Sequence, residues 1–466
     1  MSCSRSLTLA LMRSHNFSQV EPAVVAGLAT FETRNDFMTV VSKESIDTVS
    51  FIASRIELKE SARTVLVNML ILRSRSMNNF LDAALPKNEE AAMKGADNVL
   101  NYKKNALVDF TQVVRFSIKV VLHKLYQFFS VDRPLKEAVI RSWSHTTLKY
   151  YSKEVKSSTI LVYPFTGNPL RGIVYLIQLR RNKYDARLAY LPYHFSDVLK
   201  LWLNVRKRDV LLAEFEFDAF YRHAKELLGK GIAKIYSTDE FEVASHILHG
   251  ELMNSGVVSI NKCHGLSLYG PYVAATKFYV LNESQKRYYS LRGKVLEFIV
   301  DIPRPCDKPL VARNEAFVVV YMAGNWSKGK AKSQYKLQAG ILQSLRSLAD
   351  DKEMEVFVRP HPDWGVLKKL SILRMKQGAL LNNMEDVAGK TIVFVNIASG
   401  SFFYYRNWGV TLFIEGENIN PSELFGDKYN LCPVEALHER ILRLKDSYEY
   451  KSAHEAQLRS VQSQAI

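Results

Sequence analysis

The chain has 466 residues, 47% of them hydrophobic and 24% charged, and a formal net charge of +16. This composition is typical of a globular protein and excludes a disordered one, and the length allows two or three domains. The four cysteines are widely spaced without a Cys-x-x-Cys pair, which favours a reducing compartment over a disulfide framework or a zinc site. The positive charge indicates an anionic partner: nucleic acid, a lipid surface or a charged sugar donor. Nucleic acid is not expected, because no Arg-Gly repeats, zinc knuckles or RNP-like aromatic strands accompany the charge.

Residues 1–150 are predicted to form a mostly helical N-terminal region. An apolar stripe recurs there at helical spacing, with basic residues between its members. The stripe consists of Phe110, Val114, Ile118, Val121, Leu125 and Phe128, and the basic residues are Arg115, Lys119 and Lys124. It has two interpretations: a core-facing helix with solvated lysines, or a basic amphipathic helix that lies on an anionic membrane.

Charged residues interrupt the apolar region 107–129, which excludes an ordinary membrane-spanning helix. The first residues also lack the pattern of a secretory signal. We therefore expect a cytoplasmic protein, peripheral on the inner face of the cytoplasmic membrane if the stripe binds lipid.

From about residue 158 the pattern changes to alternating strands and helices. Apolar, β-branched runs predict strands at 159–163, 187–191, 232–236, 257–260, 278–281 and 295–300, with helices at 171–181 and 241–254. Such alternation is typical of a parallel sheet with helices on its faces. It predicts a first Rossmann-like domain over residues 151–302.

A proline-rich break at 301–309 separates this domain from a second one. The alternation then restarts, with strands predicted at 316–322, 356–358, 392–395 and 411–414 and a helix at 333–348. These elements predict a second Rossmann-like domain over residues 310–445, and residues 446–466 are expected to form a helical tail. The predicted fold class is α/β, with two Rossmann-like domains facing a cleft and a helical N-terminal extension.

Polar clusters follow two strands of the second domain. Arg359 and His361 come directly after one strand, and the two prolines that flank His361 would hold its imidazole stiffly. The sequence Ser399-Gly-Ser401 follows the next strand and opens a helix, where free N–H groups favour an anion. Gly400 would allow close backbone approach. Since ligands of open α/β sheets bind beyond the carboxyl ends of the strands, these residues predict a phosphate-binding site; Ser399 and Ser401 could instead be only a helix cap.

Two strand ends of the first domain carry candidates for a general base. Asp239 is the first candidate, because a carboxylate can accept a proton from an attacking hydroxyl. His264, next to Gly265, is the second. Each has a structural alternative: Asp239 could cap a helix, and His264 could be a hydrogen-bonded turn residue.

The segment Arg359-Pro-His-Pro362, followed by Ser399-Gly-Ser401 and preceded by His264-Gly265, resembles the two-domain GT-B glycosyltransferases that build bacterial surface polysaccharides. The most similar set has a His-Pro motif and uses CMP-activated acidic sugars: sialyltransferases, polysialyltransferases and capsule Kdo transferases. CDP-glycerol glycerophosphotransferases share a similar layout. The resemblance covers about residues 158–440.

The resemblance implies an inverting, metal-independent transferase that needs no cofactor besides a nucleotide-sugar donor, expected to be CMP-linked. Its acceptor would be a glycan or a lipid-linked sugar of capsule or lipopolysaccharide synthesis. His361 would contact the donor phosphate and assist the departing nucleotide, while Ser399 and Ser401 would bind that phosphate. The family's base lies in an acidic pair followed by glycine, whereas Asp239-Glu240 is followed by Phe241.

Other functions remain open at this point. They are a CDP-glycerol-type glycerophosphotransferase, a sugar-nucleotide epimerase, a catalytically inactive scaffold of the same fold, and a non-enzymatic protein that binds nucleic acid or membrane. Release of the donor nucleotide would separate the transferase from the last two classes.

We expect His361→Ala to lower turnover by roughly 100-fold or more, the scale of losing one group that stabilises charge in a transition state. The measurement is steady-state release of the donor nucleotide by a variant whose denaturation midpoint matches the wild type. Turnover close to wild type in a folded variant would contradict the role of His361.

Overall fold

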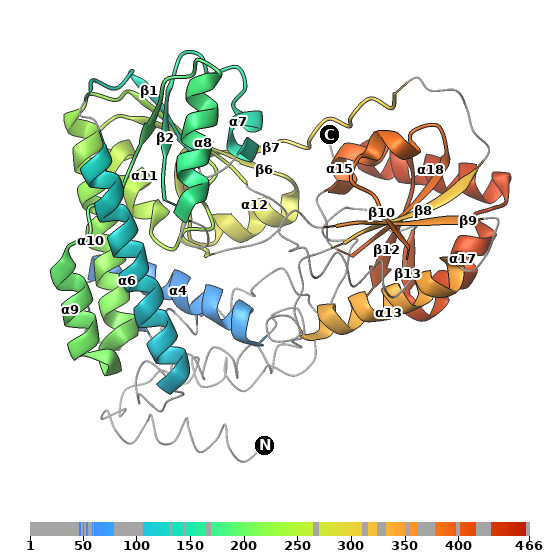
Figure 1. The fold of residues 1–466 in the computed structure, drawn as a ribbon, viewed down its shortest axis with the longest axis horizontal. Coiled ribbons are helices and arrows are strands. Elements are labelled where there is room, and N and C mark those ends of the chain that lie inside the picture. The colour runs from blue at the N-terminus through green and yellow to red at the C-terminus, as the bar shows by residue number, and fades with distance from the viewer. Residues whose placement is uncertain are drawn as a thin grey trace.

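A computed structural model gives the fold. It describes residues 46–47, 50, 53–54, 58, 60–78, 106–130, 133–142, 145–164, 169–263, 270–309, 316–323, 332–349, 354–360, 378–397, 401–415 and 430–462. Within these residues the chain forms two α/β units, each built on its own parallel sheet (Figure 1). The α/β class with two Rossmann-like units is therefore confirmed.

The first unit contains a seven-stranded sheet in which every neighbouring pair is parallel, in the order β3-β2-β1-β4-β5-β6-β7. Its strands are β1 (Ala138–Ser142), β2 (Thr159–Val162), β3 (Ala186–Leu188), β4 (Lys234–Ser237), β5 (Val258–Lys262), β6 (Ala274–Val280) and β7 (Lys294–Val300). The chain order reverses between β1 and β4. Ligands of open α/β sheets bind at such a reversal, beyond the carboxyl ends of the strands.

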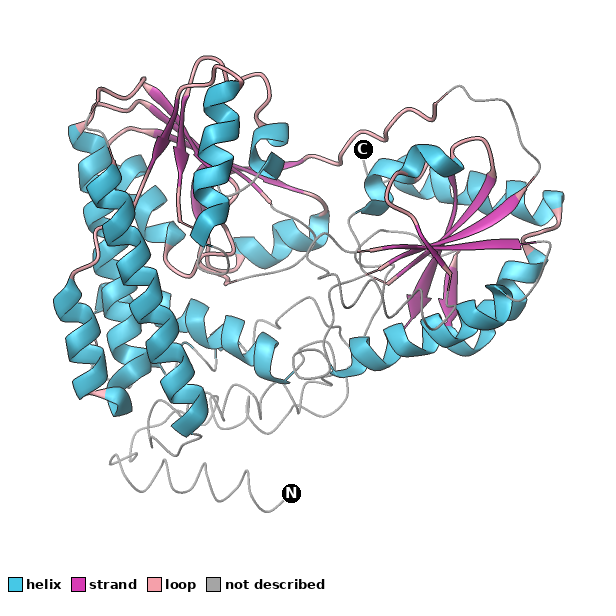
Figure 2. Cartoon of the chain, in the orientation of Figure 1, coloured by secondary structure: helices cyan, strands magenta, loops and turns pink. Residues whose placement is uncertain are grey.

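Helices cover both faces of this sheet (Figure 2). They are α4 (Glu60–Asn78), α6 (Ala106–Phe129), α7 (His145–Tyr150), α8 (Pro169–Arg181), α9 (Phe195–Leu203), α10 (Arg208–Gly229), α11 (Ser245–Asn254) and α12 (Glu283–Ser290), with a short 3-10 turn η2 (Val205–Lys207). Side chains of α8 join one core on one face of β1 and β2, and those of α10 and α11 join another core on the opposite face. The sheet is thus buried on both sides, as parallel sheets generally are.

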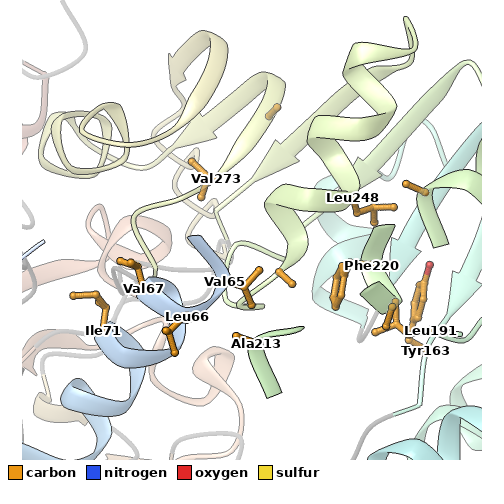
Figure 3. Close-up of a cluster of buried hydrophobic side chains, with 14 of the residues drawn as sticks. Val65, Leu66, Val67, Ile71, Tyr163, Leu191, Ala213, Phe220, Leu248 and Val273 are labelled. Carbon is orange, nitrogen blue, oxygen red and sulfur yellow. The ribbon is translucent and has the colours of Figure 1, made fainter. Parts of the chain in front are cut away.

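Helix α4 is part of the first unit, although it lies within the predicted N-terminal region. Val65, Leu66 and Val67 are buried in the same cluster as Val273 and Ala213 (Figure 3). The Asn68 amide donates to the carbonyl oxygens of Val243 and Tyr272 at 3.0 and 3.1 Å, and its oxygen accepts from the Tyr272 N–H at 3.1 Å. These buried hydrogen bonds fix the position of α4 against the unit.

Strand β1 begins at Ala138, before the boundary at residue 150 that the sequence pattern indicated. It lies between β2 and β4, near the middle of the sheet. The first α/β unit therefore starts earlier than expected, and the helical region before it is packed onto the unit instead of standing apart.

The second unit has a six-stranded parallel sheet in the order β10-β9-β8-β11-β12-β13. Its strands are β8 (Phe317–Met322), β9 (Met354–Arg359), β10 (Ala379–Leu380), β11 (Thr391–Asn396), β12 (Gly409–Glu415) and β13 (Leu431–Pro433). Its helices are α13 (Lys332–Ala349), α15 (Ser401–Tyr405), α17 (Leu437–Arg443) and α18 (Ser447–Gln462), with 3-10 turns η3 (Met384–Val387) and η4 (Val434–Ala436). Figure 1 shows α13 and α17 on one face of the sheet and α15 and α18 on the other. The chain order reverses between β8 and β11.

The predicted C-terminal tail is helical and belongs to the second unit. In α18, the Gln457 side chain accepts from the Thr411 N–H at 2.8 Å and donates to the Gly409 carbonyl oxygen at 3.1 Å. Gln457 is fully buried. It therefore supplies hydrogen-bond partners to backbone groups of β12 inside the core, where water cannot do so.

The proline-rich segment 301–309 runs along the second unit. The Cys306 N–H donates to the Tyr404 carbonyl oxygen at 2.7 Å, and the Trp408 indole N–H donates to the Cys306 carbonyl oxygen at 2.9 Å. Arg406 donates to the Pro303 carbonyl oxygen at 2.9 Å. The predicted break between the units is present, and these bonds anchor it beside α15.

In the part of the chain that the structure describes, no helix is both long enough and apolar enough to cross a membrane.

Candidate functional site

The carboxyl edge of the second sheet brings Arg359 and Asn396 to the two sides of Met322. Arg359 is the last residue of β9 and Asn396 the last of β11, and both are in register with Met322 at the end of β8. Residues in register on parallel neighbours point to the same face of a sheet. Arg359 and Asn396 therefore flank the point where the strand order reverses, two strand spacings or about 10 Å apart.

Arg359 is positioned by an aromatic ring and keeps an unused hydrogen-bond donor. Its guanidinium lies 4.8 Å from the centre of the Tyr405 ring, within the range of a cation–π contact. Its Nη1 is buried and has no hydrogen-bond partner among the described residues. A buried donor of this kind is costly unless a ligand pairs with it, and a guanidinium is well matched to a phosphate.

The other predicted phosphate ligands are only partly visible. Ser401 is the first residue of α15, as the helix-start prediction requires. Helix α15 spans five residues, so its dipole is weaker than the argument for an anion-binding helix start assumes. Ser399, Gly400 and His361 lie outside the described residues, and their roles remain predictions.

Asp239 lies two residues beyond β4, at the reversal point of the first sheet, and is fully buried. Its carboxylate forms an ion pair with Arg141 of β1. It also accepts from His249 Nε2 at 3.0 and 3.1 Å, and Asn261 Nδ2 lies 3.5 Å away. Sequence reasoning predicted the position of Asp239 at a strand end, and its role as general base stays a prediction.

The Arg141 partnership gives Asp239 a structural function. A buried arginine needs a paired carboxylate, because removing that partner would leave its charge uncompensated in the core. The Arg141 guanidinium, itself fully buried, also donates to Glu242 at 3.1 Å and lies over the rings of Tyr163 and Phe220 at 4.6 and 5.5 Å. Asp239 therefore anchors a buried cation.

His249 connects Asp239 to a serine of the next strand. Its Nδ1 lies 2.9 Å from the Ser259 hydroxyl, so the chain Asp239–His249–Ser259 is continuous. Burial lowers the pKa of His249 to about 3, and the ring is neutral at physiological pH. A neutral ring that donates from Nε2 to the carboxylate accepts the serine hydroxyl at Nδ1. All three side chains are buried, and this series of hydrogen bonds orients the carboxylate of Asp239.

The two units meet next to this site. The side chain of Tyr150, at the end of α7 in the first unit, interacts with that of Tyr404 of α15 in the second unit. Burial is the main cause that raises the pKa of Tyr150, and its interaction with Tyr404 and the nearby charge of Glu240 raise it further. Glu240 is itself buried. The neighbour of Asp239 in the chain therefore lies beside the contact between the units.

Sequence reasoning missed the residues that organise this site. Arg141, His249, Tyr150 and Tyr404 were not candidates. For Arg141 a signal existed, because one arginine interrupts the apolar strand Ala138–Ser142. His264 lies outside the described residues, and its role as an alternative base remains a prediction.

No family model matches the chain, and no curated protein matches it significantly in sequence. The solved structures that align with its fold include the following two. "Spinosyn Forosaminyltransferase SpnP" is 9% identical, with a TM-score of 0.39, over 71% of this chain and 96% of that one. "Spinosyn Rhamnosyltransferase SpnG complexed with spinosyn aglycone" is 10% identical, with a TM-score of 0.28, over 70% and 90%. At these scores the likeness assigns neither a family nor an activity.

The fold and the site define a two-unit α/β protein with a polar cluster at the strand-order reversal of each sheet. The first cluster contains Asp239, Glu240 and Arg141, and the second contains Arg359 and Asn396. Tyr150 and Tyr404 join the units beside the first cluster.

We expect Asp239→Asn to lower the free energy of unfolding by about 3 kcal/mol, because it weakens the pairing of a buried arginine. It should also abolish transfer while leaving nucleotide binding almost intact, if the carboxylate removes the acceptor proton. Urea denaturation, nucleotide titration and turnover measure the three quantities.

Glu242→Gln is the matched control, because it weakens another contact of Arg141 without touching Asp239. Transfer should survive in this variant. If Asp239→Asn retains transfer, the residue is an anchor only; if His264→Ala loses transfer and keeps nucleotide binding, the histidine is the base.

Stability should fall on acidification below about pH 6.5. Burial lowers the pKa of His246 and of His249 to about 3, whereas unfolded histidines titrate near 6.5. The unfolded state therefore binds more protons between these values, and each histidine contributes a slope of up to about 1.4 kcal/mol per pH unit. Urea denaturation from about pH 7.5, above this window, to about pH 5.5, inside it, measures the slope.

His246→Gln should reduce this slope, because it removes one of the buried histidines that take up a proton on unfolding. A stability that does not vary with pH in this window would show that these histidines are protonated in the folded protein.

Proposed function

We propose that the protein is a GT-B glycosyltransferase that moves a sugar from a nucleotide-linked donor to a glycan or a lipid-linked acceptor. The observation that carries the proposal is Arg359, with its buried and unpaired Nη1 at the reversal point of the second sheet. This is the place where open α/β sheets bind nucleotides, and the unpaired donor suits a phosphate oxygen.

The division of charge between the units supports a transferase over a simple nucleotide-binding protein. An acidic pair, Asp239 and Glu240, follows β4 of the first unit, and both residues are buried. A carboxylate near an acceptor hydroxyl can remove its proton, while a cation near the donor phosphate can stabilise the departing nucleotide. The interaction of Tyr150 with Tyr404 supports this division, because it joins the two units beside Glu240.

The finer proposal concerns the donor. The motif Arg359-Pro-His-Pro362 favours a CMP-linked acidic sugar, used in the synthesis of a capsule or lipopolysaccharide at the cytoplasmic face of the membrane. Titration with CMP, CDP and UDP tests this directly, because a nucleotide that binds the native state raises the melting temperature. CDP-glycerol distinguishes the glycerophosphotransferase alternative, since that enzyme class would release CMP from it.

Arg359→Ala should weaken nucleotide binding by roughly 10- to 100-fold, the scale of losing a charge-assisted hydrogen bond. Isothermal titration with the nucleotide that gives the largest thermal shift measures the loss. Arg346→Ala is the matched control, because Arg346 is an exposed arginine in the last turn of α13. Equal affinities of the two variants would contradict the assignment of Arg359, and the absence of any nucleotide effect on the wild type would contradict the function itself.

A further inference from the structure

Helix α6 has two apolar faces. One face is buried in the first unit through Val113, Phe116 and Val120, and Lys119 pairs with Glu216 of α10 at 2.6 Å. The other face is exposed and consists of Ile118, Val121, Leu125, Phe128 and Phe129, with Phe128 81% exposed. The stripe predicted from the sequence lies on this exposed face in all its described positions from Ile118 onward. Its interpretation as a core-facing stripe is therefore wrong, because a different set of α6 residues fills the core.

Helix α9 packs against α6, and helix α8 approaches α6 near its own N-terminal end (Figure 1). Trp202 of α9 donates to the Ser117 hydroxyl of α6 at 3.2 Å, and Gly172 of α8 approaches the Tyr126 hydroxyl of α6. The exposed apolar residues are Ile173, Val174 and Ile177 on α8 and Phe195, Leu199, Trp202 and Leu203 on α9. Elsewhere in the described residues, Tyr221, Leu296, Leu442 and Tyr448 are the large apolar side chains with comparable exposure. We call the exposed residues of α6, α8 and α9 the three-helix face.

The three-helix face has a basic surround. The three helices contain seven lysines and arginines but two acids, Asp109 and Asp197. Asp197 is buried and accepts from the His194 N–H at 2.9 Å. Arg115 and Lys124 fall on opposite flanks of the exposed α6 stripe at 3.6 residues per turn. Exposed apolar side chains gathered in one place indicate an interaction site, and basic flanks indicate that the partner is anionic.

The geometry points to a membrane-docking surface: the three-helix face binds an anionic lipid bilayer, with its phenylalanines, leucines and Trp202 among the acyl chains and its lysines and arginines among the headgroups. Interfacial helices combine these two features, and each basic residue near an anionic leaflet adds to the attraction. This inference stands apart from the proposed function, because none of its residues belongs to the candidate site.

A lipid surface fits this face better than a second copy of the chain does. In a two-fold dimer the same patch meets itself, so the basic flanks of one copy would lie against those of the other. Like charges brought together in this way oppose association. An anionic bilayer accepts the same charges without repulsion.

The test is sedimentation of the full-length protein with vesicles. Phosphatidylglycerol mixed equally with phosphatidylcholine provides the anionic surface, and phosphatidylcholine alone provides the neutral one. The wild type should sediment with the anionic vesicles at low salt and dissociate as salt rises, because salt screens exposed charges. Phe128→Ser, Leu199→Ser and Leu203→Ser combined should lower the partition coefficient by roughly 100-fold, since three large apolar side chains no longer leave water.

Leu296→Ser combined with Tyr448→Ser is the matched control, because these side chains are 78% and 80% exposed but lie outside the three-helix face. This variant should bind as the wild type does. Point substitutions are preferable to deletion of residues 1–150, which would remove β1 from the sheet. Three results would overturn the inference. The wild type could stay in the supernatant at low salt, or the folded triple variant could bind the vesicles normally. The third result is that the wild type forms a dimer without lipid and the triple variant is a monomer.

Discussion

The buried charge of Arg141 is the constraint on which the first unit depends. A charge inside a protein is tolerated only when it is paired and hydrogen-bonded, and Arg141 lies in a central strand with no exposure to water. Its partners come from distant parts of the chain: Asp239 after β4, the ring of Tyr163 after β2 and that of Phe220 on α10. Burial of the strand therefore depends on contacts between segments that are far apart in the sequence. The reversal point of the sheet is therefore held by electrostatics as well as by apolar packing.

This constraint separates the roles of two neighbouring acids. Asp239 is committed to Arg141 and to the His249–Ser259 chain, which holds its carboxylate in one orientation. Glu240 instead lies near Tyr150, Tyr151 and Cys263, beside the contact with the second unit. Burial raises the pKa of these three groups, and the charge of Glu240 raises it further. Asp239, which anchors Arg141, and Glu240, which lies near Tyr150, are thus adjacent in the chain. A catalytic side chain depends on supporting contacts that hold its geometry. The contacts of Asp239 provide such support for this acidic pair.

The sequence predicted the parts of this fold that rest on local pattern. Apolar runs located β2, β4, β7, β8, β11 and β12, and the prolines located the break between the units. Strand β1 was missed because Arg141 interrupts its apolar pattern, and its partner Asp239 is 98 residues away. Pairings over such distances leave no periodic signal. The exposed stripe of α6 was found by its period, but period alone does not reveal which of two apolar faces is buried. Arg359 was found because it ends a strand, whereas the Tyr150–Tyr404 contact required the units to be placed in space.

Helix α15 connects the elements that a transferase would have to coordinate. In five residues it supplies the ring of Tyr405 under Arg359, the side chain of Tyr404 against Tyr150, and a carbonyl oxygen for the N–H of Cys306 in the segment between the units. Phe402 and Phe403, between Ser401 and these tyrosines, are buried in the same apolar cluster as much of the first unit. A change in the distance between the units must therefore displace α15 or break its contacts. Displacing α15 would move the ring that supports Arg359, so the placement of the two units and the position of Arg359 are physically coupled.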